Sequence, residues 1–182
     1  ELGQHKEARE HLKKLTSSHP HRDAAHYYLG RLEEVENNWE KAMSWYLLVG
    51  EGEYYYDARA NVAEMQARIG MVDEARVSLQ QLRNETSAES VRVRLYLAEG
   101  QILRDAERLD EAMALYNEVL ETYSGNVELL YARGMLAERM GRLDLLEQDM
   151  KEILKQEPDN ATTLNALGYT LVDRTDRIDE GH

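Results

Sequence analysis

Apolar residues recur along the chain with the spacing of an amphipathic helix. Five segments each carry apolar side chains at positions i, i+4 and i+7, and this spacing places the three groups on one face of a helix. The five stripes are Ala8-Leu12-Leu15, Ala42-Tyr46-Val49, Ala75-Leu79-Leu82, Ala112-Tyr116-Val119 and Leu146-Met150-Ile153. Short breaks that contain Gly or Asn precede most of them, and these residues favour the C-cap of a preceding helix. The pattern therefore predicts an all-α chain of consecutive helices.

Two ladders of small residues divide the chain into units of similar length. The first ladder is Gly30, Ala63, Gly100, Gly134 and Gly168, at intervals of 33, 37, 34 and 34 residues. The second ladder is Ala8, Ala42, Ala75, Ala112 and Leu146, at intervals of 34, 33, 37 and 34 residues. Small residues at these positions let the two helices of a unit approach each other closely. The repeating unit is therefore a helix–turn–helix of about 34 residues.

This unit resembles the tetratricopeptide repeat (TPR). The shared features are the small residue at unit position eight, the alanine at twenty, a large residue at twenty-four and a closing proline, which Pro20 and Pro158 supply. The resemblance implies an α–α superhelix, a TPR solenoid. Its four complete repeats are 23–55, 56–92, 93–126 and 127–160, with half repeats at 1–22 and 161–182. Because both ends fall within a repeat, we expect a single array that is a fragment of a longer one.

Two positions depart from the regular unit. The interval of 37 adds three residues to the connection around Arg83–Ser90, in which loop and N-cap residues are expected at Asn84, Thr86, Ser87 and Ser90. A longer loop costs little free energy, and a local change of superhelix pitch is the alternative. Leu146 stands where the other units have alanine. Its two helices are therefore expected to lie further apart or to pack differently.

Composition narrows the class of function. The chain has 182 residues, with 22 Lys and Arg against 35 Asp and Glu, which gives a formal net charge of −13. This charge argues against a nucleic-acid partner, including that of an RNA-binding pentatricopeptide-like array, because phosphate contacts need an excess of cations. The absence of cysteine excludes disulfides and thiolate sites. No apolar run approaches the roughly 20 residues that span a bilayer, so we expect no membrane insertion of this segment.

Residues that could carry catalysis or bind a metal are few. His19, His21 and His26 lie close together in sequence, but a zinc site needs three or four converging ligands, and surface histidines are the simpler interpretation. Acid pairs such as Glu33-Glu34 are expected on solvated helix faces. The chain contains no nucleophile elbow, P-loop or HExxH motif. We therefore expect no catalytic residue, no cofactor and no metal.

The candidate binding site follows from the TPR resemblance. In that family the first helices of the repeats line a concave groove through unit positions two, five, nine, twelve and thirteen. The side chains expected to contact a partner there are Tyr27, Arg31, Arg94, Leu97, Gln101, Tyr131, Met135, Asn165 and Tyr169. Any single tyrosine could instead cover the seam between repeats. For Tyr54-Tyr55-Tyr56, at a repeat junction, packing is favoured over an exposed contact.

One ligand class of TPR proteins does not fit this groove. Co-chaperones that hold the C-terminal carboxylate of a chaperone have Lys at position five and Asn at position nine. Here Tyr27 and Arg31 occupy those positions, and only Asn61 matches the Asn of the following repeat. A carboxylate clamp of that kind is therefore not expected.

The resemblance implies a non-catalytic scaffold or adaptor that binds a protein or peptide segment in its groove. The alternatives are a regulatory segment of a larger enzyme and a structural oligomerisation module, and apolar faces at the chain ends could support self-association. Residues 160–174 resemble a segment of TPR proteins from Gram-negative bacteria, some of which are lipid-anchored at the outer membrane. This favours the bacterial periplasm or outer-membrane periphery over the cytoplasm.

Overall fold

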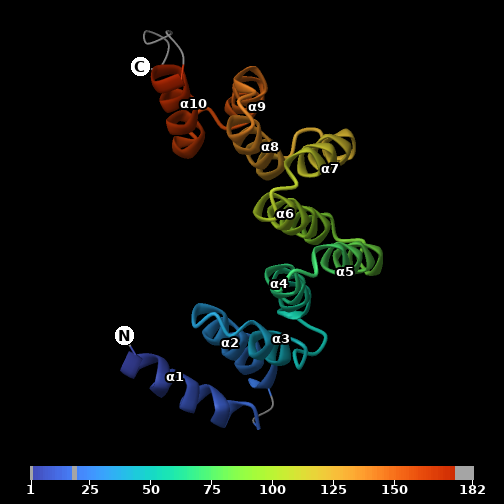
Figure 1. Ribbon diagram of the computed structural model, residues 1–182, viewed down its shortest axis with the longest axis vertical. Coiled ribbons are helices and arrows are strands. Elements are labelled where there is room, and N and C mark those ends of the chain that lie inside the picture. Colours follow the sequence, from blue (N-terminus) through green and yellow to red (C-terminus); the bar gives the residue numbers. More distant parts are fainter. Residues whose placement is uncertain (1, 18–19, 175–182) are drawn as a thin grey trace. The chain divides into compact units, whose positions relative to one another are not determined.

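The protein is built from consecutive α-helices. The computed structural model describes residues 2–17 and 20–174, and in these ranges it contains ten helices and no strand (Figure 1). They are α1 (Leu2–Leu15), α2 (Arg22–Val35), α3 (Trp39–Tyr46), α4 (Tyr55–Arg68), α5 (Val72–Glu85), α6 (Glu89–Asp105), α7 (Leu109–Thr122), α8 (Val127–Arg139), α9 (Leu143–Gln156) and α10 (Ala161–Arg174). The all-α fold predicted from the apolar spacing is confirmed. None of the described helices is both long enough and apolar enough to cross a membrane.

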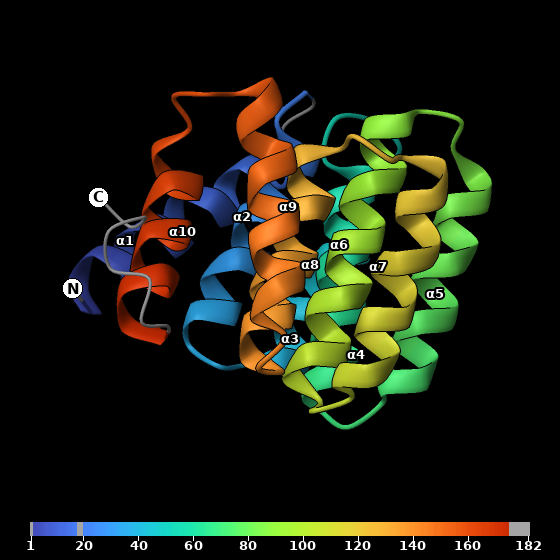
Figure 2. The same cartoon turned by 90° about the horizontal axis from the view of Figure 1, so that it is seen from above.

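The chain forms two compact units, residues 1–102 and 103–182, and the division falls inside α6. In the first unit α2 packs against α1 and α3, α3 against α4, and α4 against α5. In the second unit α7 packs against α8, α8 against α9, and α9 against α10. Figure 2 shows the close antiparallel pairing of α8 with α9. Within each unit, helices that follow one another in sequence are therefore neighbours in space, as in a repeat array.

The apolar stripes form the core. In the first unit one buried cluster consists of Ala42, Tyr46, Val49, Ala58, Val62 and Met65, and a second of Ala63, Ala75, Leu79, Leu82, Leu95 and Ile102. Each cluster contains a complete stripe from the second helix of a repeat. In the second unit the stripe that begins at Leu146 is fully buried. Burial of these faces is the main driving force for the fold.

Glycines of the first ladder set how closely two helices approach. A Cβ atom on Gly30 would lie 2.5 Å from Cε1 of Tyr46, so only glycine leaves room for the ring. In the second unit a Cβ on Gly134 would collide with Met150 and would lie 3.3 Å from Cδ1 of Leu146. Leu146 is fully buried beside this glycine, and the wider spacing or different packing expected for its two helices stays a prediction.

Helix α3 ends earlier than the other second helices. It has 8 residues, whereas α5, α7 and α9 each have 14. Leu47 and Leu48 follow it and are 55% and 54% exposed. Side chains from neighbouring helices satisfy the carbonyls at this end: Nη1 of Arg59 donates to Tyr46 O at 3.1 Å, and Nδ1 of His26 lies 3.2 Å from Leu48 O. These contacts add to the turn bond from Val49 N to Tyr46 O at 3.2 Å and cap the end of α3.

The three added residues of the long repeat extend a helix rather than a loop. Only residues 86–88 connect α5 to α6, and α6 has 17 residues where α2, α4 and α8 have 13 or 14. The prediction is confirmed for Thr86 and Ser87, which lie in the connection, and is wrong for Asn84 and Ser90, which lie in α5 and α6. The physical reason is that Val91, at helical spacing before Leu95, packs against the core and favours an earlier start of the helix.

Arginines link the second helix of one repeat to the first helix of the next. Nε of Arg9 on α1 donates to Oε1 of Glu33 on α2 at 3.2 Å, and Nε of Arg76 on α5 donates to Oε1 of Glu99 on α6 at 2.9 Å. Each arginine directly follows an alanine of the second ladder. In the second helices α3 and α7 the residue after the ladder alanine is a methionine instead, Met43 or Met113. Charged and apolar side chains therefore alternate at this one position of the repeats.

Candidate partner-binding faces of the A helices

We call α2, α4, α6, α8 and α10 the A helices, because each opens a repeat. Their groove face is the side formed by unit positions two, five and nine, which lie three or four residues apart and therefore face the same way. The candidate residues on this face are Tyr27 and Arg31 on α2, Arg94, Leu97 and Gln101 on α6, Tyr131 and Met135 on α8, and Asn165 and Tyr169 on α10. The two compact units are described separately below.

On α6, the guanidinium of Arg94 is already paired. Its Nη1 lies 2.8 Å from Oδ1 of Asp57 on α4 and 3.2 Å from Oδ2. Both side chains are exposed, so water screens the pair, and such pairs contribute about 1 kcal/mol or less. Leu97 and Gln101 on the same face are half-buried. A ligand carboxylate could reach Arg94 only by competing with Asp57.

On α2, Arg31 belongs to a short polar chain that leads into the core. The hydroxyl of Tyr46 donates to Oε2 of Glu34 at 2.7 Å, and Nε of Arg31 lies 3.9 Å from the same oxygen. Burial, followed by the hydrogen bond to Glu34, raises the pKa of Tyr46 above its usual range. Arg31 itself is exposed. Because its ion pair is longer than that of Arg94, Arg31 is the more accessible of these two groove arginines to a partner.

Tyr27 is part of an aromatic cluster rather than an open contact. Its ring centroid lies 5.0 Å from that of Tyr54 and 5.7 Å from that of the buried Tyr46, and its side chain is half-buried. The next residue, Tyr28, packs edge-on against Tyr27 at 5.5 Å yet remains 48% exposed. A hydrogen bond with Tyr28 raises the pKa of Tyr54. Tyr28, which the family positions omit, is therefore the ring that a partner can reach.

The three consecutive tyrosines at the repeat junction pack against the core. Tyr54 contacts the cluster around Tyr46, and Tyr55 and Tyr56 contact the cluster around Leu79. The guanidinium of Arg59 lies 5.0 Å from the ring centroid of Tyr55. Packing was the favoured prediction for this segment, and the structure confirms it.

In the second unit the groove face becomes more exposed from α8 to α10. Tyr131 and Met135 on α8 are half-buried. Asn165 and Tyr169 on α10 are exposed, and Tyr169 presents 60% of its surface to solvent. Tyrosine with this much free surface can contribute both an apolar ring and a hydrogen bond to an interface.

Two residues considered for chemistry are buried instead of solvated. His26 is not a surface histidine, because it is buried, stacked on Trp45 and bonded to the Leu48 carbonyl. Glu33 is 6% exposed and paired with Arg9, so its assignment to a solvated face is wrong. Among the described residues no group of three His, Asp or Glu side chains could hold a metal ion. His19 lies outside the described residues.

The repeat pattern has a direct counterpart among known families. The profile of the tetratricopeptide repeat matches residues 1–56, 68–127 and 97–161. The chain belongs to the tetratricopeptide repeat family. A curated relative, the TPR repeat-containing protein PA4667 of Pseudomonas aeruginosa, is 39% identical over 158 residues. The match covers 87% of this chain and 26% of the relative, so the chain spans about a quarter of that protein's length.

Solved TPR structures share the fold. A tetratricopeptide repeat protein from Parabacteroides merdae has a TM-score of 0.61 at 15% identity, over 99% of this chain and 72% of that one. MamA has a TM-score of 0.57 at 14% identity, over 84% and 88% of the two chains. YrrB, a TPR protein with an unusual peptide-binding site, has a TM-score of 0.52 at 17% identity, over 91% and 84%. The fold is thus that of a TPR superhelix, an architecture that supports a protein-interaction scaffold.

Proposed function

We propose that this TPR array is a non-catalytic scaffold that binds a segment of a partner protein on the groove face of its A helices. The proposal is carried by two solvent-exposed tyrosines on A helices, Tyr169 on the groove face of α10 and Tyr28 on α2, directly beside the groove residue Tyr27. Tyrosine is enriched at the centres of protein interfaces and is a frequent hot spot. Tyr28 is exposed although it packs edge-on against Tyr27 and Tyr54, and its free surface supports a binding role.

The charge of the chain indicates which partner segment would be favoured. The net charge is −13, and the groove arginine Arg94 is neutralised by Asp57. An acidic protein attracts basic partners and increases their rate of association. The groove segment of the partner should therefore combine an apolar or aromatic anchor with lysine or arginine.

A paired capture experiment tests this function. One bait is the unchanged array, a second carries Tyr28→Ala and Tyr169→Ala, and a third carries Val77→Ala and Met71→Ala as a matched control. Val77 and Met71 are also exposed apolar residues, but they lie on and just before α5, away from the groove face. A protein captured from a lysate by the first and third baits and lost from the second supports the proposal. Equal capture by all three baits contradicts it.

The alternative functions stay predictions. An oligomerisation module would show concentration-dependent sedimentation, whereas a scaffold that binds one partner segment per chain would sediment as a monomer. A regulatory segment of an enzyme would have a catalytic domain elsewhere in the longer protein. The repeat boundaries and the envelope location expected from the sequence also remain predictions.

A further inference from the structure

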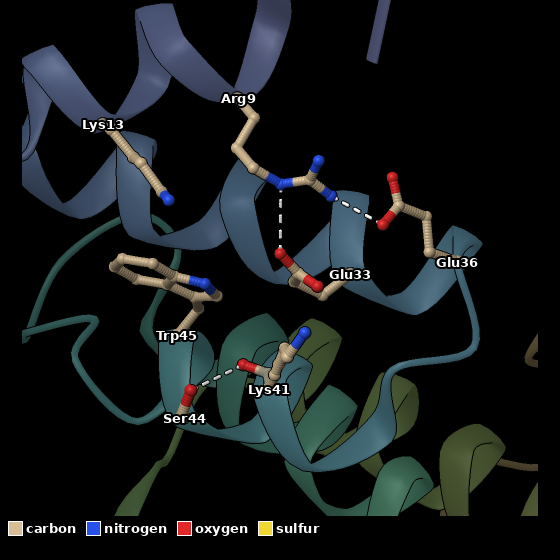
Figure 3. Close-up of a pocket in the computed structure, with 7 residues that line it drawn as sticks. All are labelled: Arg9, Lys13, Glu33, Glu36, Lys41, Ser44 and Trp45. Carbon is tan, nitrogen blue, oxygen red and sulfur yellow. Dashed lines mark hydrogen bonds and ion pairs between the residues drawn. The ribbon is translucent and has the colours of Figure 1, made fainter. Parts of the chain in front are cut away.

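A cleft of about 500 Å³ lies between α1, α2 and α3 (Figure 3). It does not belong to the groove face. The residue that α2 contributes to its floor, Glu33, follows the groove residue Arg31 by two positions, which is about 200° around an α-helix. The other walls come from α1 and α3, which are second helices of their repeats. The cleft therefore opens on a different side of α2 from the groove face.

One end of the cleft is an internally satisfied ion cluster. Arg9 donates from Nε to Glu33 at 3.2 Å and from Nη2 to Glu36 at 2.7 Å. Asn38 donates to the second oxygen of Glu33 at 3.0 Å, and His5 lies 3.8 Å from Glu36. The hydrogen bond from Arg9 lowers the pKa of Glu36. Both carboxylates are thus committed to groups of this chain, and Arg9 is not available to a ligand.

The other end presents two lysines and an indole. Figure 3 shows Lys13 extending from α1 toward the ring of Trp45, with Lys41 rising from α3 beside it. Within the part of the chain that the structure describes, neither lysine takes part in an ion pair. Trp45 is half-buried and is held by stacking on His26, with ring centroids 5.9 Å apart. The indole is therefore a fixed apolar wall between two ammonium groups, of which Lys41 also acts at longer range on the carboxylate of Glu36 and helps to lower its pKa.

The lysines of this chain are unevenly distributed. Four of the six lie between residues 6 and 41. The other two, Lys151 and Lys155, form ion pairs with Glu147 and Glu152 on their own helix, at 2.5 Å and 2.6 Å. An unpaired lysine pair on a protein with a net charge of −13 is a local exception, and most of the surface repels an anionic ligand.

We propose that this cleft binds an acidic segment of a partner protein. A carboxylate of that segment would pair with Lys13 and Lys41, and an adjacent apolar side chain would lie on Trp45. The occupant is set by charge complementarity, because the lining carries three cations, Arg9, Lys13 and Lys41, against the two carboxylates of Glu33 and Glu36, and both carboxylates are held by Arg9. This site is separate from the groove, so a partner could engage both faces or only one.

A fluorescence titration tests the proposal. Trp39→Phe leaves Trp45 as the only indole, and the probe is the peptide acetyl-Asp-Glu-Leu-Asp-Glu-amide, compared with acetyl-Asn-Gln-Leu-Asn-Gln-amide. The acidic peptide should change the emission of Trp45, and Lys13→Gln with Lys41→Gln should weaken its binding about tenfold or more. The amide peptide should bind to the unchanged array no more tightly than the acidic peptide binds to the Lys13→Gln, Lys41→Gln variant. Circular dichroism checks that the variants remain helical.

A matched variant separates a specific site from general electrostatics. Lys151→Gln with Lys155→Gln changes the net charge equally, but on α9, and should leave binding of the acidic peptide unchanged. Equal weakening by both double variants overturns the proposal, as does equal binding of the two peptides. Inorganic phosphate that displaces the peptide at equal concentration would identify a general anion site and would also overturn it. The groove variant Tyr28→Ala with Tyr169→Ala should bind the acidic peptide normally, so failure of either proposal can be recognised separately.

Discussion

Gly30 lies directly against the ring of Tyr46, and a Cβ atom at Gly30 would approach Cε1 of that ring to 2.5 Å. The ring cannot easily move, because it is fully buried and its hydroxyl donates to Glu34 at 2.7 Å. The contact fixes the spacing of α2 and α3. In the following repeat the same two positions hold Ala63 and Leu79. A larger residue on one helix is thus matched by a smaller one on its partner.

Gly30→Ala is expected to destabilise the protein by about 1–3 kcal/mol, because an added methyl group overpacks a rigid site. Urea unfolding followed by circular dichroism measures the change. Gly125→Ala is the control, since a Cβ there makes only ordinary contacts beyond 3.5 Å and should change stability by less than about 0.5 kcal/mol. A Gly30→Ala effect no larger than that of Gly125→Ala would contradict the packing argument.

The combination of Gly30→Ala with Tyr46→Leu should be less destabilising than the sum of the two single changes. It recreates the Ala63 and Leu79 pair of the next repeat, which fits without a clash. The coupling free energy from the double-mutant cycle is expected to be about 1 kcal/mol or more. Strict additivity would show that the two positions do not share one packing constraint.

Asp149→Ala is expected to cost about 3 kcal/mol of unfolding free energy. The carboxylate is almost fully buried and accepts hydrogen bonds from Nη2 and Nε of Arg133 at 2.6 Å and 2.9 Å. Its removal would leave a largely buried guanidinium without its main partner. Glu152→Ala on the same helix removes the exposed pair with Lys155 and should cost less than about 1 kcal/mol. Similar losses for the two variants would argue against a special role of burial.

Stability should decline at high pH through Tyr116. Burial raises the pKa of Tyr116 to about 12, from an ordinary value of 10. Above pH 10 the unfolded chain loses this proton more readily than the folded chain, so the contribution is complete below pH 10 and is lost as the pH rises toward 12. Urea unfolding from pH 9 to 11.5 should therefore show a shallower decline for Tyr116→Phe. Tyr169→Phe, on an exposed ring, should follow the unchanged protein.

Arg59→Met should destabilise the protein by about 1–2 kcal/mol. Its guanidinium donates to Tyr46 O at 3.1 Å and Val49 O at 3.4 Å, just after the end of α3, and adds a second bond at Tyr46 O, which also accepts from Val49 N at 3.2 Å. Arg59→Lys should recover part of the loss, because an ammonium group can reach one carbonyl but not both. Hydrogen exchange should report faster opening of α3 in Arg59→Met. Unchanged exchange in α3 would refute the capping role.

Periodic features could be predicted from the sequence, because they depend on residues within one or two helical turns. The stripes from Ala42 and Ala75 are buried as expected. The early end of α3 could not be predicted, since it depends on Arg59 from the next repeat. Burial of Glu33 depends on Arg9, which lies 24 residues away, and that of His26 on the Leu48 carbonyl, 22 residues away. The spacing of apolar residues within one helix does not reveal such pairs, because their members lie in different helices.

The helices that carry the candidate residues could be predicted from the sequence, but the exposure of each side chain could not. The family positions place Tyr27 and Tyr169 on A helices, and the structure places both there. Whether a ring is exposed depends on its neighbours. Tyr27 is half-buried because Tyr54 from the repeat junction packs on it, whereas Tyr28 projects past the same cluster.

The polar contacts that cross the junctions between repeats have a consequence for shortening or recombining such arrays. A cut that removes α1 strips Arg9 from Glu33, and a cut between α5 and α6 strips Arg76 from Glu99, so either leaves a carboxylate without its arginine. A cut after α3 exposes the apolar surface around Met43 and also strips Arg59 from the carbonyls of Tyr46 and Val49. A capping helix grafted at any of these three junctions must therefore supply the missing polar partner as well as cover apolar surface.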